Sequence, residues 1–376
     1  MTFGKKTAVI VLSAVLVFVV IDFVSAYFLF FYQMAFGGKD VWESGTKRPV
    51  AYSDGVTPSL SAVNTLIDRI KEISRQRVNP ASEQPRISGA PPAVLFRRNE
   101  EFGWVANPGV YRFVFGGLRD KQLDKPLYHD WQATILPDGS RATSRHPIAR
   151  EHQILVFGDS WLFGWALDEE LTMAWHLQSE FRDRFSVKLY AQGGYGHLQA
   201  LANFHKYKNK VGKGDILIFG YAQWLLPRNL PSPSVVVSLA EGLKKYADGP
   251  GKPLMYPRAI ISGNRVRLEP LPLDCEMARD YCNRKEPTLD ELFDVTNKIF
   301  DEIIDDTKAR VLVLLMDGPE DKVIEHLRKR GVTVVDGRQP RDFFARDTLE
   351  PYDAHPGPIS NHYWFTQLRK EIEGRQ

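Results

Sequence analysis

Five short apolar runs in the second half of the chain alternate with stretches that have helical spacing. Each run has the four to six residues of a buried strand: 154–157, 187–190, 215–219, 311–316 and 332–335. After the first run, apolar side chains recur three, three and four residues apart at Leu171, Ala174, Leu177 and Phe181, which predicts a helix. Further helices are predicted over 197–208, 288–308 and 319–330, and from about residue 359. Alternating strands and helices favour parallel β-α-β units, so residues 151–376 are predicted to form a three-layer α/β/α sandwich around a five-stranded parallel sheet.

Two segments depart from this alternation. Residues 227–284 form an insertion, in which 259–268 is predicted to be a hairpin that turns on Ser262-Gly263-Asn264. Residues 93–150 are predicted to form short strands with turns over 104–109, 110–115 and 133–141, the last around Pro137-Asp138-Gly139. We therefore expect a β-rich lead-in that covers one flank of the sandwich.

The amino-terminal segment predicts a membrane anchor. Residues 7–36 contain about 24 mostly apolar residues, enough to cross a hydrocarbon core of about 30 Å, and Lys5 and Lys6 precede them. This pattern favours a single-pass signal anchor in the inner membrane with residues 1–6 in the cytoplasm and the rest of the chain periplasmic. A cleaved signal peptide ending near Val24-Ser25-Ala26 is the alternative. Residues 37–92 are predicted to be a stalk helix and a proline-rich linker.

Charge, cysteine content and the lack of ligand motifs limit which partners, cellular compartment and cofactors the sequence predicts. The 376 residues include 49 basic and 46 acidic side chains without a basic block, which argues against a nucleic-acid partner. The two cysteines, Cys275 and Cys282, lie seven apart and are predicted to form a local disulfide in an oxidising compartment. There is no metal-ligand spacing and no phosphate-binding glycine loop, so the sequence predicts neither a metal nor a cofactor.

Two motifs carry candidate chemistry. Gly158-Asp159-Ser160 lies between the first strand of the sheet and a helix, where a serine hydroxyl is held clear of the sheet edge. By itself this triplet is also an ordinary strand-to-helix turn, in which Asp159 braces the backbone. Near the other end, Asp353-Ala-His355-Pro precedes the last helix. Because the carboxyl ends of parallel strands meet at one edge, we expect Ser160 and His355 to lie together there.

The two motifs resemble those of the GDSL/SGNH hydrolase family, over roughly residues 154–368. That family has a Gly-Asp-Ser nucleophile after the first strand and an Asp/His pair before the last helix. The resemblance implies that Ser160 is the nucleophile, His355 its base and Asp353 the group that orients the base. It also implies oxyanion donors at the Ser160 N–H and at the N–H of Gly194, which follows the second strand.

The chain departs from the family at two points. The family's Gly-x-Asn after the third strand reads Gly220-Tyr221-Ala222, so the third oxyanion donor is expected from Gln223 or, more remotely, from Asn229. The family's common Asp-x-x-His is here Asp-x-His, a spelling also found in polysaccharide O-acetyltransferase relatives.

The sequence thus favours a membrane-anchored serine esterase or deacetylase, whose partner is an acylated carbohydrate or small ester of an envelope or exported polysaccharide. A polysaccharide O-acetyltransferase, or a non-catalytic module that binds glycan or the envelope polysaccharide machinery, remains the alternative. Trp161, Phe163, Trp165 and Trp224 are predicted to form an apolar wall or a sugar platform, with at least two of them packed in the core.

Overall fold

The computed structural model describes residues 95–120, 125–244, 254–263, 265–339, 347 and 355–374. The predicted cytoplasmic tail (1–6), anchor (7–36) and stalk (37–92) lie outside the described residues, and so does Asp353. Among the helices within these ranges, none is both long and apolar enough to cross a membrane.

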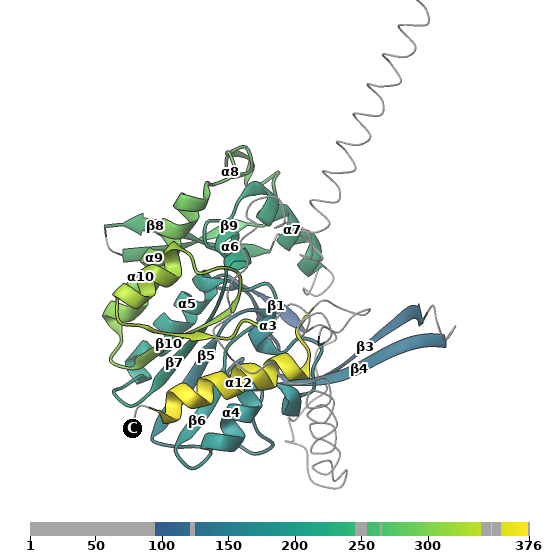
Figure 1. Ribbon diagram of the computed structural model, residues 1–376. Helices are drawn as coiled ribbons and strands as arrows, with labels where there is room; N and C mark the ends of the chain where they lie inside the picture. Colours follow the sequence, from purple (N-terminus) through teal and green to yellow (C-terminus); the bar gives the residue numbers. More distant parts are fainter. Residues whose placement is uncertain are drawn as a thin grey trace, which may run out of the picture. The chain divides into compact units, whose positions relative to one another are not determined.

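A five-stranded parallel sheet forms the centre of the molecule, which confirms the predicted fold class (Figure 1). Its strands, in the spatial order β11-β10-β7-β5-β6, are β11 (Thr333–Asp336), β10 (Arg310–Asp317), β7 (Ile216–Ala222), β5 (His152–Phe157) and β6 (Phe185–Leu189). In the register, Ile154 of β5 lies opposite Val187 of β6 and Ile216 of β7. All seven residues of β7 are buried, because helices cover both faces of a parallel sheet.

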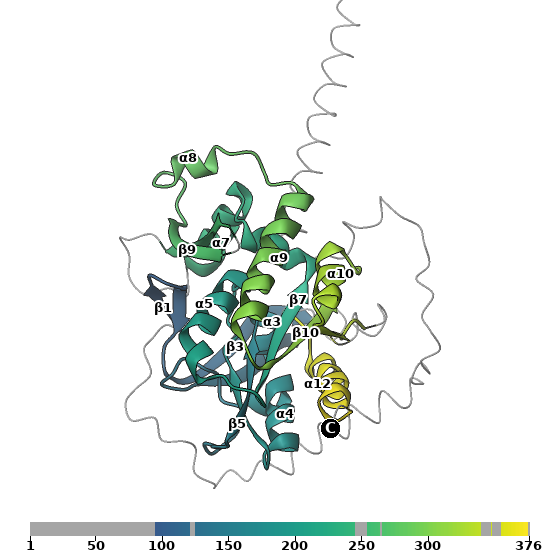
Figure 2. The same cartoon turned by 90° about the vertical axis from the view of Figure 1, so that its left-hand side faces the viewer.

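Helices pack in two layers, one on each face of the sheet. One layer contains α4 (Met173–Phe181) and α12 (Pro358–Glu373), and the other contains α5 (His197–Tyr207), α9 (Leu289–Asp306) and α10 (Lys322–Lys329). Figure 2 shows α5 and α9 on the opposite side of the sheet from α12. A capping box opens α9, in which the Thr288 hydroxyl accepts from the Glu291 N–H and the Glu291 carboxylate accepts from the Thr288 N–H.

The lead-in is an antiparallel structure with longer strands than the sequence predicted. A short pair, β1 (Phe96–Asn99) and β2 (Gly103–Ala106), precedes a long ribbon of β3 (Gly109–Asp120) and β4 (Lys125–Ile135), which reaches away from the sheet in Figure 1. The strand-and-turn segment predicted over 133–141 is present in part: β4 ends at Ile135, and an antiparallel bridge pairs Ile135 with Arg141. A turn follows, in which the Gly139 N–H donates to the Leu136 carbonyl and Asp138 accepts from the Ser140 N–H.

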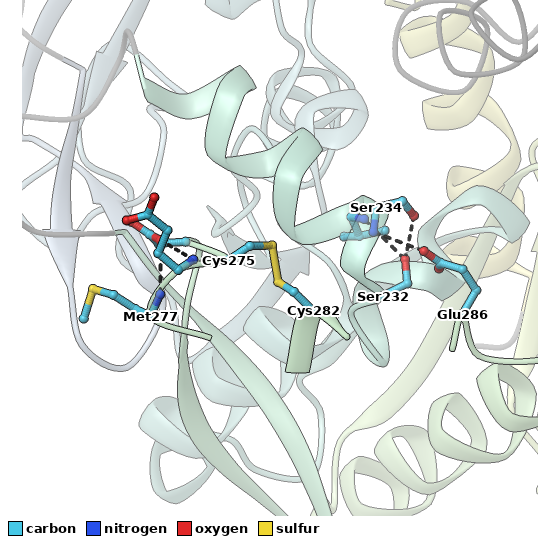
Figure 3. The surroundings of a disulfide bond; sticks show 9 residues. Ser232, Ser234, Cys275, Met277, Cys282 and Glu286 are labelled. Atoms are coloured by element: carbon cyan, nitrogen blue, oxygen red, sulfur yellow. Dashed lines mark hydrogen bonds between the residues drawn. A yellow bond between two sulfur atoms is a disulfide. The ribbon is translucent and has the colours of Figure 1, made fainter. Parts of the chain in front are cut away.

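The insertion contains the predicted hairpin and a disulfide. Strands β8 (Met255–Ser262) and β9 (Arg265–Pro272) pair antiparallel, and the Val266 N–H donates to Glu302 of α9. The insertion's helices are α6 (Leu226–Asn229), α7 (Pro233–Lys244) and α8 (Arg279–Cys282). Cys275 and Cys282 are bonded, with their Cα atoms 5.6 Å apart, beside the serines that begin α7 (Figure 3).

Candidate active site

Ser160 occupies the first position of a short helix that begins where β5 ends. The helix, α3 (Ser160–Phe163), turns back so closely that a Cβ on Gly158 would lie 2.7 Å from Leu162 Cδ1. Only glycine fits that position, which explains the first residue of the motif. The first residues of a helix have N–H groups without intrahelical partners, so α3 presents free backbone donors beside the serine hydroxyl.

The structure brings Ser160 and His355 into direct contact, although 195 residues separate them. His355 Nε2 lies 2.8 Å from Ser160 Oγ, and both side chains are partly buried. The Trp165 ring lies against the imidazole, with 6.2 Å between ring centroids. When the hydroxyl donates to Nε2, the imidazole carries its proton on Nδ1, which is the tautomer that a general base requires.

The start of α12, three residues after His355, is fixed by side chains that the sequence analysis did not single out. Asp347 is buried and accepts from the N–H groups of Ile359 (3.0 Å) and Ser360 (2.5 Å). Burial raises the pKa of Asp347 to about 6. Asn361 accepts from the Met173 N–H of α4 at 3.1 Å. These contacts hold the segment that carries His355 against the helix layer. They could not be predicted from any local sequence motif.

Asp159 places a buried carboxyl group next to the nucleophile. Its side chain is 0% exposed, and its Oδ2 is 3.5 Å from Ser160 Oγ, at the limit of a hydrogen bond. Burial raises the pKa of Asp159, and the positive charge of Arg228 and a hydrogen bond from the Trp161 N–H oppose that shift. In the described part of the chain, no three His, Cys, Asp or Glu side chains are grouped so that they could hold a metal ion.

Gly194 lies in the loop after β6, and the lead-in holds that loop in place. Gly194 has a φ of +77°, a conformation that favours glycine. The Gln192 N–H donates to the Gly158 carbonyl at 3.3 Å, which ties this loop to the nucleophile turn. Trp104 of β2 donates from Nε1 to the Gly193 carbonyl (2.9 Å), and its own carbonyl accepts from the Tyr195 hydroxyl (2.6 Å). Trp104 is thus a positioning residue that the sequence analysis missed, because its contacts lie about 90 residues away.

The two candidates for the missing asparagine differ in what surrounds them. The amide of Asn229 is fully buried and already used: its oxygen accepts from the His197 N–H, and its nitrogen donates to His197 Nδ1 and to the Thr296 hydroxyl. Burial lowers the pKa of His197 to about 4, so this ring is neutral and structural. Gln223 follows β7 directly, and its buried Oε1 has no hydrogen-bond partner among the described residues. Because an oxyanion needs a donor, the relevant atom is the amide nitrogen, and the Gln223 Nε2 makes no hydrogen bond within the described residues.

Replacing Gln223 by Ala is expected to lower kcat roughly 10²–10³-fold with little change in KM, if its amide stabilises the oxyanion. A donor that acts only on the developing charge contributes to the transition state and not to substrate binding. Steady-state kinetics on a nitrophenyl acetate measure both constants. The matched control is Asn229→Ala, for which we expect loss of stability as the main effect. An unchanged rate for Gln223→Ala would leave only two oxyanion donors.

The four aromatic residues around the site divide evenly between the core and the surface. Phe163 and Trp165 are buried, and Trp165 packs edge-on against Trp131 of β4 with centroids 5.3 Å apart. Trp161 and Trp224 are only half-buried, and their ring centroids are 5.2 Å apart. Phe163 and Trp165 thus pack in the core, as was expected of at least two of the four. Trp161, which directly follows Ser160, forms an aromatic pair with Trp224.

Arg141 supports the opposite end of α3. Its guanidinium is completely buried and donates to the carbonyl oxygens of Phe163 and Gly164 (2.7 Å each), Gln132 (3.1 Å) and Leu167. Burial lowers its pKa to about 10, so the group stays charged at neutral pH. The buried Arg141 cation thus stabilises the backbone that follows Ser160.

Comparison with known proteins finds similarity in structure alone. No family model matches the chain, and no curated protein matches it. Solved GDSL-family structures do match. A lipolytic G-D-S-L protein from Veillonella parvula is 11% identical, covering 60% of this chain and 100% of its own, with a TM-score of 0.35. The esterase EstA from Pseudoalteromonas sp. is 9% identical over 58% of this chain and 98% of its own, with a TM-score of 0.34. An acetyl xylan esterase from Geobacillus stearothermophilus is 12% identical over 60% and 96%, with a TM-score of 0.32.

Proposed function

We propose that this protein is a serine esterase of the SGNH type that removes an acyl group, in the first place acetyl, from an ester on an envelope or exported polysaccharide. The observation that carries the proposal is the 2.8 Å contact between Ser160 Oγ and His355 Nε2 at the carboxyl end of a parallel sheet. A serine hydroxyl is a poor nucleophile at neutral pH unless a base accepts its proton. The half-buried Trp161–Trp224 pair beside Ser160 supports a sugar as the bound group, because an aromatic face stacks on the apolar face of a sugar ring.

In the proposed reaction, Ser160 Oγ attacks the ester carbonyl carbon while its proton passes to His355 Nε2. The negative charge that develops on the carbonyl oxygen is stabilised by the N–H groups of Ser160 and Gly194 and by the Gln223 amide. The C–O bond to the sugar then breaks, and the sugar oxygen takes the proton from His355. Water attacks the acyl-serine, gives its proton to His355, and the carboxylic acid leaves with Ser160 restored.

The alternative function is transfer of the acyl group to a sugar hydroxyl in place of water. The first half of the reaction is the same, and the Asp-x-His spelling at Asp353 and His355 favours this alternative. Release of free acetate, compared with formation of a newly acetylated oligosaccharide, distinguishes the two acceptors.

The decisive experiment labels the full-length protein in detergent with a serine-directed fluorophosphonate. We expect stoichiometric labelling of the wild type, none of Ser160→Ala, and release of acetate from an acetylated oligosaccharide. If the wild type takes no label and cleaves no acetyl ester, the esterase proposal should be replaced by that of a glycan-binding module.

We further propose that residues 7–36 anchor the protein in the inner membrane, with residues 37–376 on the periplasmic side. The Cys275–Cys282 disulfide supports an oxidising compartment. A reporter that is active only outside the cytoplasm is expected to be active when fused after Gln376. Activity of a cytoplasm-dependent reporter at the same position would show the opposite topology. A mature chain that begins near Tyr27 would show that the segment is a cleaved signal peptide.

A further inference from the structure

We propose that Arg228 forms an anion subsite beside Ser160, which binds the carboxylate of an acidic sugar next to the acylated one. The natural substrate class is then an esterified polysaccharide that contains uronic acids. This inference rests on the proposed function and adds to it the chemistry of the substrate.

Three contacts place Arg228 at the same edge of the sheet as the nucleophile. Its Nη1 donates to the carbonyl of Tyr195, the residue after Gly194, at 2.7 Å. Its guanidinium lies over the Trp224 ring, 5.1 Å from the centroid. Trp224 in turn packs against Trp161, the residue after Ser160. The cation therefore borders both the Gly194 loop and the half-buried aromatic pair.

Arg228 has unused hydrogen-bonding capacity. Among the described residues, one of its five N–H donors has a hydrogen-bond partner, and no carboxylate lies within ion-pair distance. By contrast, Arg141 donates to four carbonyl oxygens, and Arg258 and Arg338 pair with carboxylates. Arg228 forms no ion pair with the buried Asp159 carboxyl, although its charge opposes the rise that burial causes in the pKa of that group. The other N–H donors of Arg228 therefore remain for a ligand.

Two polar atoms of adjacent residues beside Arg228 lack hydrogen-bond partners in the described part of the chain. The Trp224 Nε1 and the Gln223 Oε1 are both buried, and neither has a hydrogen-bond partner among the described residues. Buried polar groups of a folded protein are almost always hydrogen-bonded. Because both atoms are closed to solvent, a sugar hydroxyl reaches them only when the Gln223 and Trp224 side chains move on binding, so they support the inference less directly than the contacts of Arg228.

The shape of the guanidinium selects a carboxylate. Its planar group pairs with a carboxylate through two parallel N–H···O bonds, and such charge-assisted bonds are about twice as strong as neutral ones. A uronic acid combines a flat carboxylate with a sugar ring that can stack on an adjacent aromatic face. The net charge of the chain is only +3, so the attraction is local to this site.

The test compares two acetylated oligosaccharides of equal length, one of uronic acids and one of neutral sugars. We expect wild-type kcat/KM to favour the acidic substrate. Arg228→Met should lower the ratio of the two kcat/KM values roughly 10- to 100-fold, mainly through KM, because a hydrogen bond to a charged group is lost. Arg228→Lys should restore part of the ratio, and higher salt should reduce the ratio in wild type and Arg228→Lys but not in Arg228→Met. The matched control is Arg182→Met, an arginine after α4 that is 69% exposed and lies at the opposite end of the sheet.

The possible results distinguish failure of the Arg228 subsite from failure of the proposed esterase activity. Equal wild-type rates on the two substrates, or an equal loss on both in Arg228→Met, would overturn the inference and leave Arg228 only as the support of the Tyr195 carbonyl. Calorimetric binding of both oligosaccharides to Ser160→Ala gives a second readout without catalysis. Arg228-dependent binding of the acidic oligosaccharide without any wild-type hydrolysis would retain the subsite and reject the esterase. Equal binding of both oligosaccharides would reject the subsite.

Discussion

Replacing Ser160 by Ala is expected to lower kcat for a nitrophenyl acetate by about 10⁴- to 10⁶-fold, and His355→Ala should cause a loss of the same order. In the proposed reaction the two side chains act in one step, because Ser160 Oγ attacks as its proton moves to His355 Nε2, 2.8 Å away. For this reason the double variant should be no slower than either single one. Asp353→Asn tests the orienting role that the family resemblance implies for Asp353: it should cost less, but still orders of magnitude, through the wrong tautomer of the imidazole.

The measurement is kcat per mole of purified protein, with circular dichroism to show that each variant is folded. His326→Gln is the matched control: this histidine pairs with Asp301 on the surface between α9 and α10, and its rate should stay within a factor of two. A Ser160→Ala variant that keeps a tenth of the wild-type rate would remove Ser160 from the reaction.

The sheet could be predicted from the sequence because its strands are buried on both faces. Such strands appear as continuous apolar runs, and the run at 154–157 lies within β5. The meeting of Ser160 with His355 followed from two motifs and one topological rule, that parallel strands bring their carboxyl ends to one edge. Local pattern and long-range topology agreed at this site.

The supports of the site could not be predicted in the same way. Trp104 and Arg141 act on residues about 90 and about 22 to 26 positions away, and each contact joins a side chain to a backbone carbonyl. Every residue has a backbone carbonyl, so the residue that accepts such a bond cannot be recognised from its side chain. The choice between Gln223 and Asn229 likewise depended on which amide was already hydrogen-bonded, and only the packing around His197 reveals that.

Replacing Arg141 by Met is expected to lower the free energy of unfolding by about 3–5 kcal/mol. Methionine retains most of the side-chain volume, so the loss comes from the charge and its hydrogen bonds. Four carbonyl oxygens around α3 lose a buried donor. Glu169, which is 7% exposed, also loses the cation that most opposes the effect of burial on its pKa. An uncompensated buried carboxylate is the costliest of these changes.

The pH dependence of the loss tests this cause. Burial already raises the pKa of Glu169, and removing Arg141 should raise it further. A carboxyl group whose folded pKa is raised contributes stability that is fully present below its unfolded pKa of about 4.3 and is lost as the pH rises through the folded pKa. Urea unfolding should therefore show a larger difference between Arg141→Met and wild type at pH 7 than at pH 5.

Two further variants isolate the buried charge. In the double variant Arg141→Met/Glu169→Gln, part of the lost stability should return, because no buried carboxylate is left without its cation. Arg145→Met removes a nearby arginine whose ion pair with Glu170 is partly exposed, and should cost less than about 1 kcal/mol. A loss for Arg141→Met that is equal at both pH values and unaffected by Glu169→Gln would place its cause in the carbonyl contacts alone. Arg141 would then act on the nucleophile helix by hydrogen bonding, with Glu169 as a bystander.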